Sequence, residues 1–206
     1  PAQIRQLCAE ARQYQFASVC INSLHVPVAH QALLGSDIKT CTVVGFPLGA
    51  SPTAVKVTEA EIAIGAGAAE IDMVMAVGAL KGGGRGAGAG DVRALADACH
   101  ASGAILKVIL EMGLLTRREK ILACLISKAA GADYVKTSTG FIAGGATVED
   151  VELMRRVVGP SMGVKAAGGV RSLEDARAML QAGSTRLGSS AGVKIAQGLA
   201  VEKDVY

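Results

Sequence analysis

The stretch AGADYVKT at residues 130–137 decides the fold. Its glycine can end a helix in the left-handed conformation, and the apolar residues that follow predict a short strand. A similar order of small residues, AGA at 66–68 and AGS at 182–184, precedes two further predicted strands. This recurrence predicts alternating helices and strands, which is typical of a parallel α/β sheet.

The same alternation extends in both directions from these points. Short apolar runs predict seven strands, at residues 16–21, 38–44, 70–75, 105–110, 134–137, 163–167 and 185–187. The segments between them predict helices at residues 3–14, 26–34, 51–64, 91–101, 116–130, 148–157, 172–182 and 191–197. Ser51 and Ser172 are predicted N-caps, Thr116 with Glu119 is a predicted capping box, and the glycine-rich segment 82–90 is expected to be flexible.

The repeated alternation of strands and helices indicates a barrel of the (β/α)8 type, a TIM barrel. Such a barrel has eight strands and about 250 residues, whereas this chain of 206 residues shows seven predicted strands. An open sheet would leave two strand edges unpaired, so we expect the first strand to lie upstream of residue 1. Residues 1–206 are expected to form a single barrel domain.

Composition and charge exclude several classes of protein. Aromatic residues make up 3% of the chain and the net charge is +3, which disfavours a nucleic-acid surface. The five cysteines form no CxxC pair and the three histidines show no metal spacing, so we expect free thiols in a reducing compartment and no metal. No apolar run reaches the length of a membrane span and no signal peptide is recognisable, which predicts a cytoplasmic protein.

Four charged residues interrupt strands that should be apolar. Asp72 lies within IDMV, and Lys107, Lys136 and Lys165 follow one another at intervals of 29 residues, about one β/α unit each. Buried lysine and aspartate are rare unless paired, and barrel active sites form at the C-terminal mouth. The set therefore predicts imine chemistry on a carbonyl substrate, with a neutral lysine as nucleophile beside a second cation. The alternatives are a charge network that only fills the barrel, or lysines that reach outward to solvent.

Two glycine-containing loops predict a phosphate site. Gly168 and Gly169 follow one predicted strand, and Gly188-Ser189-Ser190 follows the next and opens a predicted helix. Exposed backbone N–H groups and helix N-termini attract anions, and barrels often bind phosphate after their last two strands. The carbonyl substrate would then be a phosphorylated sugar, although either loop can also be an ordinary turn.

Three further residues are weaker candidates. Glu111, at the end of the Lys107 strand, is expected either to pair with a lysine at the barrel mouth or to be a surface carboxylate. Cys20 is expected to pack in the core or to approach the site. Tyr206 ends the chain and is expected to fray, or to fold over the mouth.

Ordered motifs along most of the chain resemble the deoxyribose-phosphate aldolase family. The matching stretches are FASVCIN (16–22), TVVGFPLG (42–49), EIDMV (70–74), LKVILE (106–111), VKTSTGF (135–141), GGAT (144–147), GVKAAGG (163–169) and RLGSS (186–190). The resemblance implies reversible cleavage of 2-deoxy-D-ribose 5-phosphate to D-glyceraldehyde 3-phosphate and acetaldehyde. It also implies a first strand with an Asp-His-Thr-Leu-like motif, which residues 1–206 do not contain.

The resemblance assigns roles to the residues already singled out. Lys136 matches the Schiff-base lysine, Lys165 and Asp72 match the pair that transfers protons, and Lys107 matches a supporting lysine. Phosphate-binding positions correspond to Gly140, Gly168, Gly169, Gly188 and Ser190. The family implies no metal or organic cofactor, and a homodimer or homotetramer. The alternatives are a non-catalytic barrel that binds a sugar phosphate, or a Schiff-base aldolase with another aldehyde donor.

Overall fold

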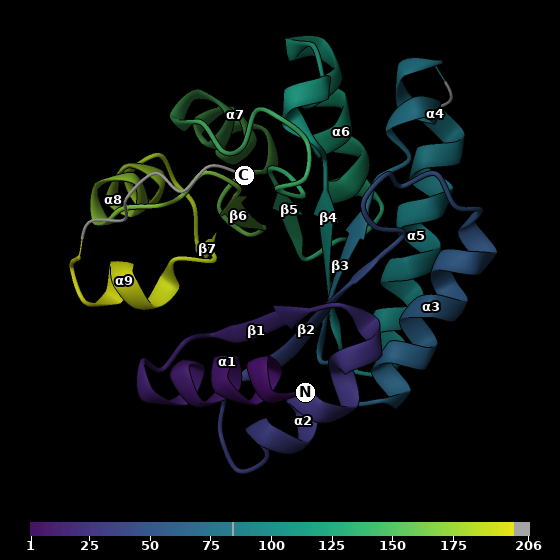
Figure 1. Ribbon diagram of the computed structural model, residues 1–206. Helices are drawn as coiled ribbons and strands as arrows, with labels where there is room; N and C mark the ends of the chain where they lie inside the picture. The colour runs from purple at the N-terminus through teal and green to yellow at the C-terminus, as the bar shows by residue number, and fades with distance from the viewer. Residues whose placement is uncertain (84, 200–206) are drawn as a thin grey trace.

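The computed structural model describes residues 1–83 and 85–199, which form a curled parallel sheet with helices on its outer side (Figure 1). Each strand pairs in parallel with the next strand of the sequence, in the order β1 to β7. The strands are β1 (Ser18–Ile21), β2 (Lys39–Val44), β3 (Glu70–Val74), β4 (Ile105–Ile109), β5 (Tyr134–Lys136), β6 (Gly163–Ala167) and β7 (Arg186–Gly188). The predicted barrel-type α/β fold is confirmed.

Helices connect the strands. They are α1 (Ala2–Gln13), α2 (Val26–Leu33), α3 (Thr53–Gly65), α4 (Val77–Lys81), α5 (Arg85–Ala101), α6 (Arg117–Ala129), α7 (Val148–Val158), α8 (Leu173–Gln181) and α9 (Gly192–Ala196), with 3-10 turns η1 (Ser23–His25) and η2 (Met112–Leu114). None of those in the described residues is long and apolar enough to cross a membrane. Tyr206, a weak candidate for the site, lies outside the described residues.

The curl of the sheet brings its two ends toward each other. Within residues 1–83 and 85–199, β1 and β7 are the edge strands, and each has one strand neighbour. Arg186 on β7 nevertheless donates from Nη1 to the Oγ of Ser18 on β1 at 3.2 Å. The concave side of the sheet is therefore an interior bordered by all seven strands and open between β1 and β7 (Figure 1).

Each strand has two different faces, which explains the charged residues in its sequence. Successive side chains of a strand point to opposite sides of the sheet. On β3, Ile71 and Met73 belong to the apolar layer between sheet and helices, whereas Asp72 points into the interior. The lysines of the following strands alternate in the same way, so the sheet has an apolar outer face and a polar concave face.

Two of the three predicted helix caps are confirmed, and one is wrong. Thr116 with Glu119, and Ser172 with Asp175, form complete capping boxes. The predicted N-cap Ser51 lies outside its helix, because α3 begins at Thr53 and no side chain caps its first turn.

The helix predicted after the glycine-rich segment 82–90 begins earlier than expected and includes most of that segment, while the flexibility of the segment stays a prediction. Helix α4 ends just before it, and α5 begins at Arg85 rather than at the predicted Asp91. Helix α5 packs against α3, α6 and β4, and Asp91 forms a buried ion pair with Lys56 of α3. This tertiary packing outweighs the low helix propensity of glycine, which is a weak local preference.

Candidate active site

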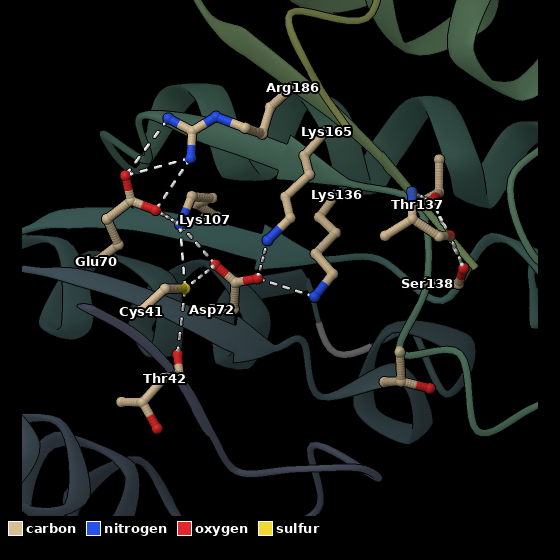
Figure 2. A network of polar contacts seen from close by, with 12 residues as sticks. Cys41, Thr42, Glu70, Asp72, Lys107, Lys136, Thr137, Ser138, Lys165 and Arg186 are labelled. Atoms are coloured by element: carbon tan, nitrogen blue, oxygen red, sulfur yellow. Dashed lines mark hydrogen bonds and ion pairs between the residues drawn. The ribbon is translucent and has the colours of Figure 1, made fainter. Parts of the chain in front are cut away.

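Asp72 lies at the centre of the polar interior and contacts all three predicted lysines (Figure 2). Its Oδ2 accepts from Lys136 Nζ at 2.8 Å and from Lys165 Nζ at 2.7 Å. Its Oδ1 accepts from Lys107 Nζ at 2.8 Å. The four charged residues that the sequence singled out therefore form one contiguous cluster.

Strand register explains this convergence. Asp72 is the Cα partner of Lys107 across β3 and β4, and Lys136 is the partner of Lys165 across β5 and β6. Partners in a parallel ladder point to the same side of the sheet. Each lysine side chain is at most 7% exposed, so the three amines lie in a mostly dehydrated interior.

The charges of the cluster stabilise one another. Burial alone would raise the pKa of Asp72, but the ammonium groups of Lys136, Lys165 and Lys107 outweigh burial and hold it well below its usual range. Burial likewise acts to lower the pKa of Lys165, yet the Asp72 carboxylate and nearby thiols outweigh it and raise that pKa above its ordinary value. Lys165 therefore keeps its proton at neutral pH.

A second carboxylate, which the sequence reasoning missed, extends the cluster. Glu70 Oε2 lies 2.7 Å from Lys107 Nζ and 3.2 Å from Arg186 Nη1. Glu70 precedes Asp72 by two residues, so the alternation that places one of them inside also places the other. Four cations and two carboxylates meet in this interior, so the carboxylates are each shared between several cations.

Two thiols border the same carboxylate. Cys41 Sγ donates to Asp72 Oδ1 at 3.3 Å and accepts from Lys107 Nζ at 3.4 Å. Cys20, exposed on β1, lies beside Cys41. The neighbouring thiol of Cys41, together with the lysines Lys165 and Lys136, lowers the pKa of Cys20 to about 7. Cys20 therefore approaches the site, which was one of its two predicted positions.

Hydroxyl groups reinforce the junction between the two strands that carry Lys136 and Lys165. Thr137 Oγ1 donates to the carbonyl of Ala167 at 2.7 Å and accepts from its N–H at 2.9 Å. Ser138 Oγ donates to the same carbonyl at 2.5 Å. Since β5 has only three residues, these side chains continue the pairing beyond the strand and fix the spacing of the two lysines.

The predicted phosphate loops lie side by side. Ala167 of β6 pairs with Gly188 of β7, and Ser189 Oγ donates to the carbonyl of Val170 at 2.6 Å. Gly168 and Gly169 both have positive φ, +84° and +79°, a conformation that glycine adopts without strain.

The helix expected to support this anion site differs from the prediction. Helix α9 begins at Gly192 and has five residues, so it is too short to supply the helix-terminus field that the sequence reasoning invoked. Gly140 and Ser190 are exposed on the loops that follow β5 and β7. The backbone N–H groups of these loops remain the candidate phosphate donors.

Glu111 occupies neither of its two predicted positions. Its side chain is buried, and its Oε2 accepts from Thr139 Oγ1 at 2.6 Å and from Thr139 N at 3.2 Å. The residue has a left-handed backbone with φ 55°, which is uncommon for a residue other than glycine. Glu111 therefore ties the end of β4 to the loop that follows Lys136.

A curled parallel sheet with facing lysines on its concave side is the arrangement of a barrel-class aldolase. The chain belongs to the DeoC/LacD family of aldolases, whose family model matches residues 2–205. The resemblance read from the sequence motifs is thereby confirmed at the level of the family.

Relatives support this placement. The deoxyribose-phosphate aldolase of Geobacillus sp. (strain WCH70) is 56% identical over 197 residues, which cover 96% of this chain and 88% of the relative. That of Streptococcus uberis (strain ATCC BAA-854 / 0140J) is 57% identical over 201 residues, covering 98% and 90%. The solved tetrameric deoxyribose phosphate aldolase from Aeropyrum pernix matches with a TM-score of 0.89 and 34% identity over 95% of this chain and 82% of that one.

Proposed function

We propose that this aldolase reversibly cleaves 2-deoxy-D-ribose 5-phosphate to D-glyceraldehyde 3-phosphate and acetaldehyde, with Lys136 as the imine-forming nucleophile and no metal or organic cofactor. The observation that carries the proposal is the shared Asp72 oxygen, 2.8 Å from Lys136 Nζ and 2.7 Å from Lys165 Nζ. Two relatives more than half identical to this chain are deoxyribose-phosphate aldolases.

The environment of each lysine supports a division of roles. Only a neutral amine attacks a carbonyl, so one lysine acts as the nucleophile while the others serve as cations. Lys107 contacts two carboxylates and Lys165 has a raised pKa, so both are suited to remain cations. Lys136 and Lys165 share one carboxylate oxygen, so the choice of Lys136 as the nucleophile rests on its match to the Schiff-base lysine of the family motif.

The reaction then proceeds in balanced steps. Lys136 Nζ adds to the C1 aldehyde, and loss of water gives an iminium ion. Removal of the proton from the C3 hydroxyl breaks the C2–C3 bond, and the electron pair moves into the iminium to form an enamine while glyceraldehyde 3-phosphate leaves. Protonation of the enamine at C2 and hydrolysis release acetaldehyde and free the lysine. Lys165 and Asp72 exchange these protons, because both lie within hydrogen-bond distance of the nucleophile or of its partner.

The phosphate is proposed to bind at the loops after β5, β6 and β7. Gly140, Gly168, Gly169, Gly188 and Ser190 supply its backbone N–H groups and one hydroxyl. The join between Ser189 and Val170 supports this assignment, because it holds the last two loops next to each other and beside the Lys165 strand.

We further propose a single domain over residues 1–206, a homodimer or homotetramer, and a cytoplasmic location. A single sheet contains every strand of the described residues. Exposed Val55 and Ile62 of α3 line an apolar hollow with Ala54, which suits a contact between copies, and the Aeropyrum pernix relative is tetrameric. The five cysteines of the chain are unpaired, as expected in a reducing compartment. Light scattering of wild type and Ile62→Glu tests the oligomer.

Borohydride trapping with acetaldehyde, followed by peptide mass mapping, tests the nucleophile. We expect a reduced adduct on the peptide that contains Lys136, and none in Lys136→Ala. The matched control is Lys128→Ala, which removes an exposed lysine of α6 and should keep the adduct. A folded wild-type protein without an adduct would contradict the proposal and leave a sugar-phosphate-binding barrel. Turnover with dihydroxyacetone but not acetaldehyde as donor would contradict the substrate.

A further inference from the structure

Three side-chain atoms of types that can ligate a metal lie together on the concave face, and they come from three adjacent strands. The Sγ atoms of Cys20 and Cys41 and a carboxylate oxygen of Asp72 all lie within 4.8 Å of one another. Cys20 and Cys41 are Cα partners across β1 and β2, so register places both thiols on one side. The mechanism of aldol cleavage uses neither thiol.

We propose that Cys20, Cys41 and Asp72 form a binding site for one thiophilic divalent cation such as Zn²⁺, and that occupation of this site inhibits the aldolase. Two thiolates and one carboxylate suit Zn²⁺, while Mg²⁺ and Ca²⁺ require oxygen ligands. The inhibition rests on the proposed function, whereas the metal binding does not.

The distances suit a tetrahedral ion. Ligand atoms about 2.0–2.3 Å from Zn²⁺ lie roughly 3.3–3.8 Å apart in a tetrahedron. Cys41 Sγ and Asp72 Oδ1 are already 3.3 Å apart, and Cys20 Sγ lies within 4.8 Å of both, so it must move closer to complete the tetrahedron. Cys20 is exposed, so solvent supplies the fourth ligand and the entry path.

Charge does not prevent binding in this positive interior. A Zn²⁺ ion that enters releases one proton from each thiol, so the total charge of the interior stays the same. Lys107 Nζ, 3.4 Å from Cys41 Sγ, is placed to donate a hydrogen bond to the bound thiolate. Such an outer partner orients a metal ligand and strengthens the site.

Inhibition follows from the position of Asp72. The metal would bind Oδ1, while Oδ2 remains against Lys136 and Lys165. A carboxylate bound to a divalent cation is a much weaker base, so Asp72 could no longer exchange protons with the two lysines. Catalysis should therefore stop while the fold remains intact.

Co²⁺ replaces Zn²⁺ as a coloured probe, and the experiment needs no substrate. We expect a cobalt–thiolate absorption band in the wild-type protein, absent from Cys20→Ala and from Cys41→Ala. Cys124→Ala removes a buried thiol of α6 and should keep the band. Asp72→Asn should weaken Co²⁺ binding at least about tenfold, the loss that even outer partners of a metal cause. Lys136→Ala should keep the band, so metal binding is separated from the assignment of the nucleophile.

Two measurements on the wild-type protein avoid variants that fail to fold. Zn²⁺ should protect the Cys20 peptide from iodoacetamide, and EDTA should restore alkylation. The same Zn²⁺ additions should abolish turnover, and EDTA should recover it, whereas Mg²⁺ should do neither. No cobalt–thiolate band, or a band that survives both cysteine variants, would overturn the site. Cys20 protection without any loss of turnover would overturn the inhibition.

Discussion

The buried pair of Lys56 and Asp91 offers a quantitative test of how α3 and α5 are held on the sheet. Lys56 Nζ lies 2.5 Å from Asp91 Oδ2 and donates to the carbonyl of Val74 at 3.0 Å. Both side chains are at most 5% exposed. Lys56→Met keeps the length of the side chain but leaves the carboxylate buried without a cation.

The expected cost follows from this burial. Breaking a buried ion pair by removing one partner costs about 3–5 kcal/mol, because an uncompensated charge remains. The Oδ1 atom of Asp91 already lacks a partner in the described residues, so the carboxylate has no second contact to replace Lys56. For a domain of this size the change corresponds to a fall in Tm of roughly 10 °C.

The double variant Lys56→Met/Asp91→Leu separates charge from packing. Replacing both partners of a buried pair by apolar groups is often neutral or stabilising. We therefore expect the free energy of unfolding of the double variant to lie within about 1 kcal/mol of the wild-type value. Urea unfolding at neutral pH measures the free energy of all three proteins. A Lys56→Met variant that loses less than about 1 kcal/mol, or a double variant as unstable as the single one, would refute the reasoning.

Three other predictions concern a helix, the pH dependence and a loop. Gly90, in α5, and Gly35, with φ +73°, both have open space where a Cβ would lie. Because Gly90 has helical backbone, Gly90→Ala should raise the free energy of unfolding by about 0.5–1 kcal/mol. Because Gly35 is left-handed, Gly35→Ala should lower that free energy by about 1–2 kcal/mol, and urea titration measures both changes. The pKa of Asp72 is lowered on folding, so its stabilising contribution is complete above about pH 4 and is lost as the pH falls further. If the free energy of unfolding of Asp72→Asn fell as steeply with decreasing pH as that of wild type, this prediction would be contradicted. Glu111→Ala leaves the N–H and hydroxyl of Thr139 without their acceptor. The variant should lose about 2–3 kcal/mol of unfolding free energy and have a lower kcat/KM. Unchanged kinetics in the folded variant would exclude a role of this contact in activity.

Much of the fold was predictable because the parallel α/β pattern repeats. Each predicted strand appears, and the stretch 130–137 that indicated the pattern begins at Ala130, the C-cap of α6, and contains all of β5. The two errors, Ser51 and the segment 82–90, both concern helix starts. Ser51 is a residue type that often caps helices, yet α3 begins only at Thr53. Glycine is a poor helix former, yet α5 includes most of the segment 82–90 because it packs against its neighbours.

Site residues were predictable from the sequence where a single strand contained a charged residue among apolar ones. A charge inside an apolar strand marks the interior, and this rule found Asp72 and the lysines. The thiol pair of Cys20 and Cys41 was not predictable, because its members lie on separate strands without metal-like spacing and meet only through register. Arg186 was missed because its partner Glu70 lies 116 residues away.

The lysines proposed for the chemistry lie on strands β4, β5 and β6, whereas the candidate phosphate contacts lie at the ends of strands and on the loops that follow them. Strand positions are fixed by neighbours on both sides, while loops at a sheet edge accept insertions and replacements. Hydroxyl contacts such as that of Thr137 with Ala167 keep the amines in place independently of loop length. The residues proposed for the chemistry and those proposed for substrate binding therefore lie mostly in different segments, so changes in the loops alone can alter the substrate during evolution.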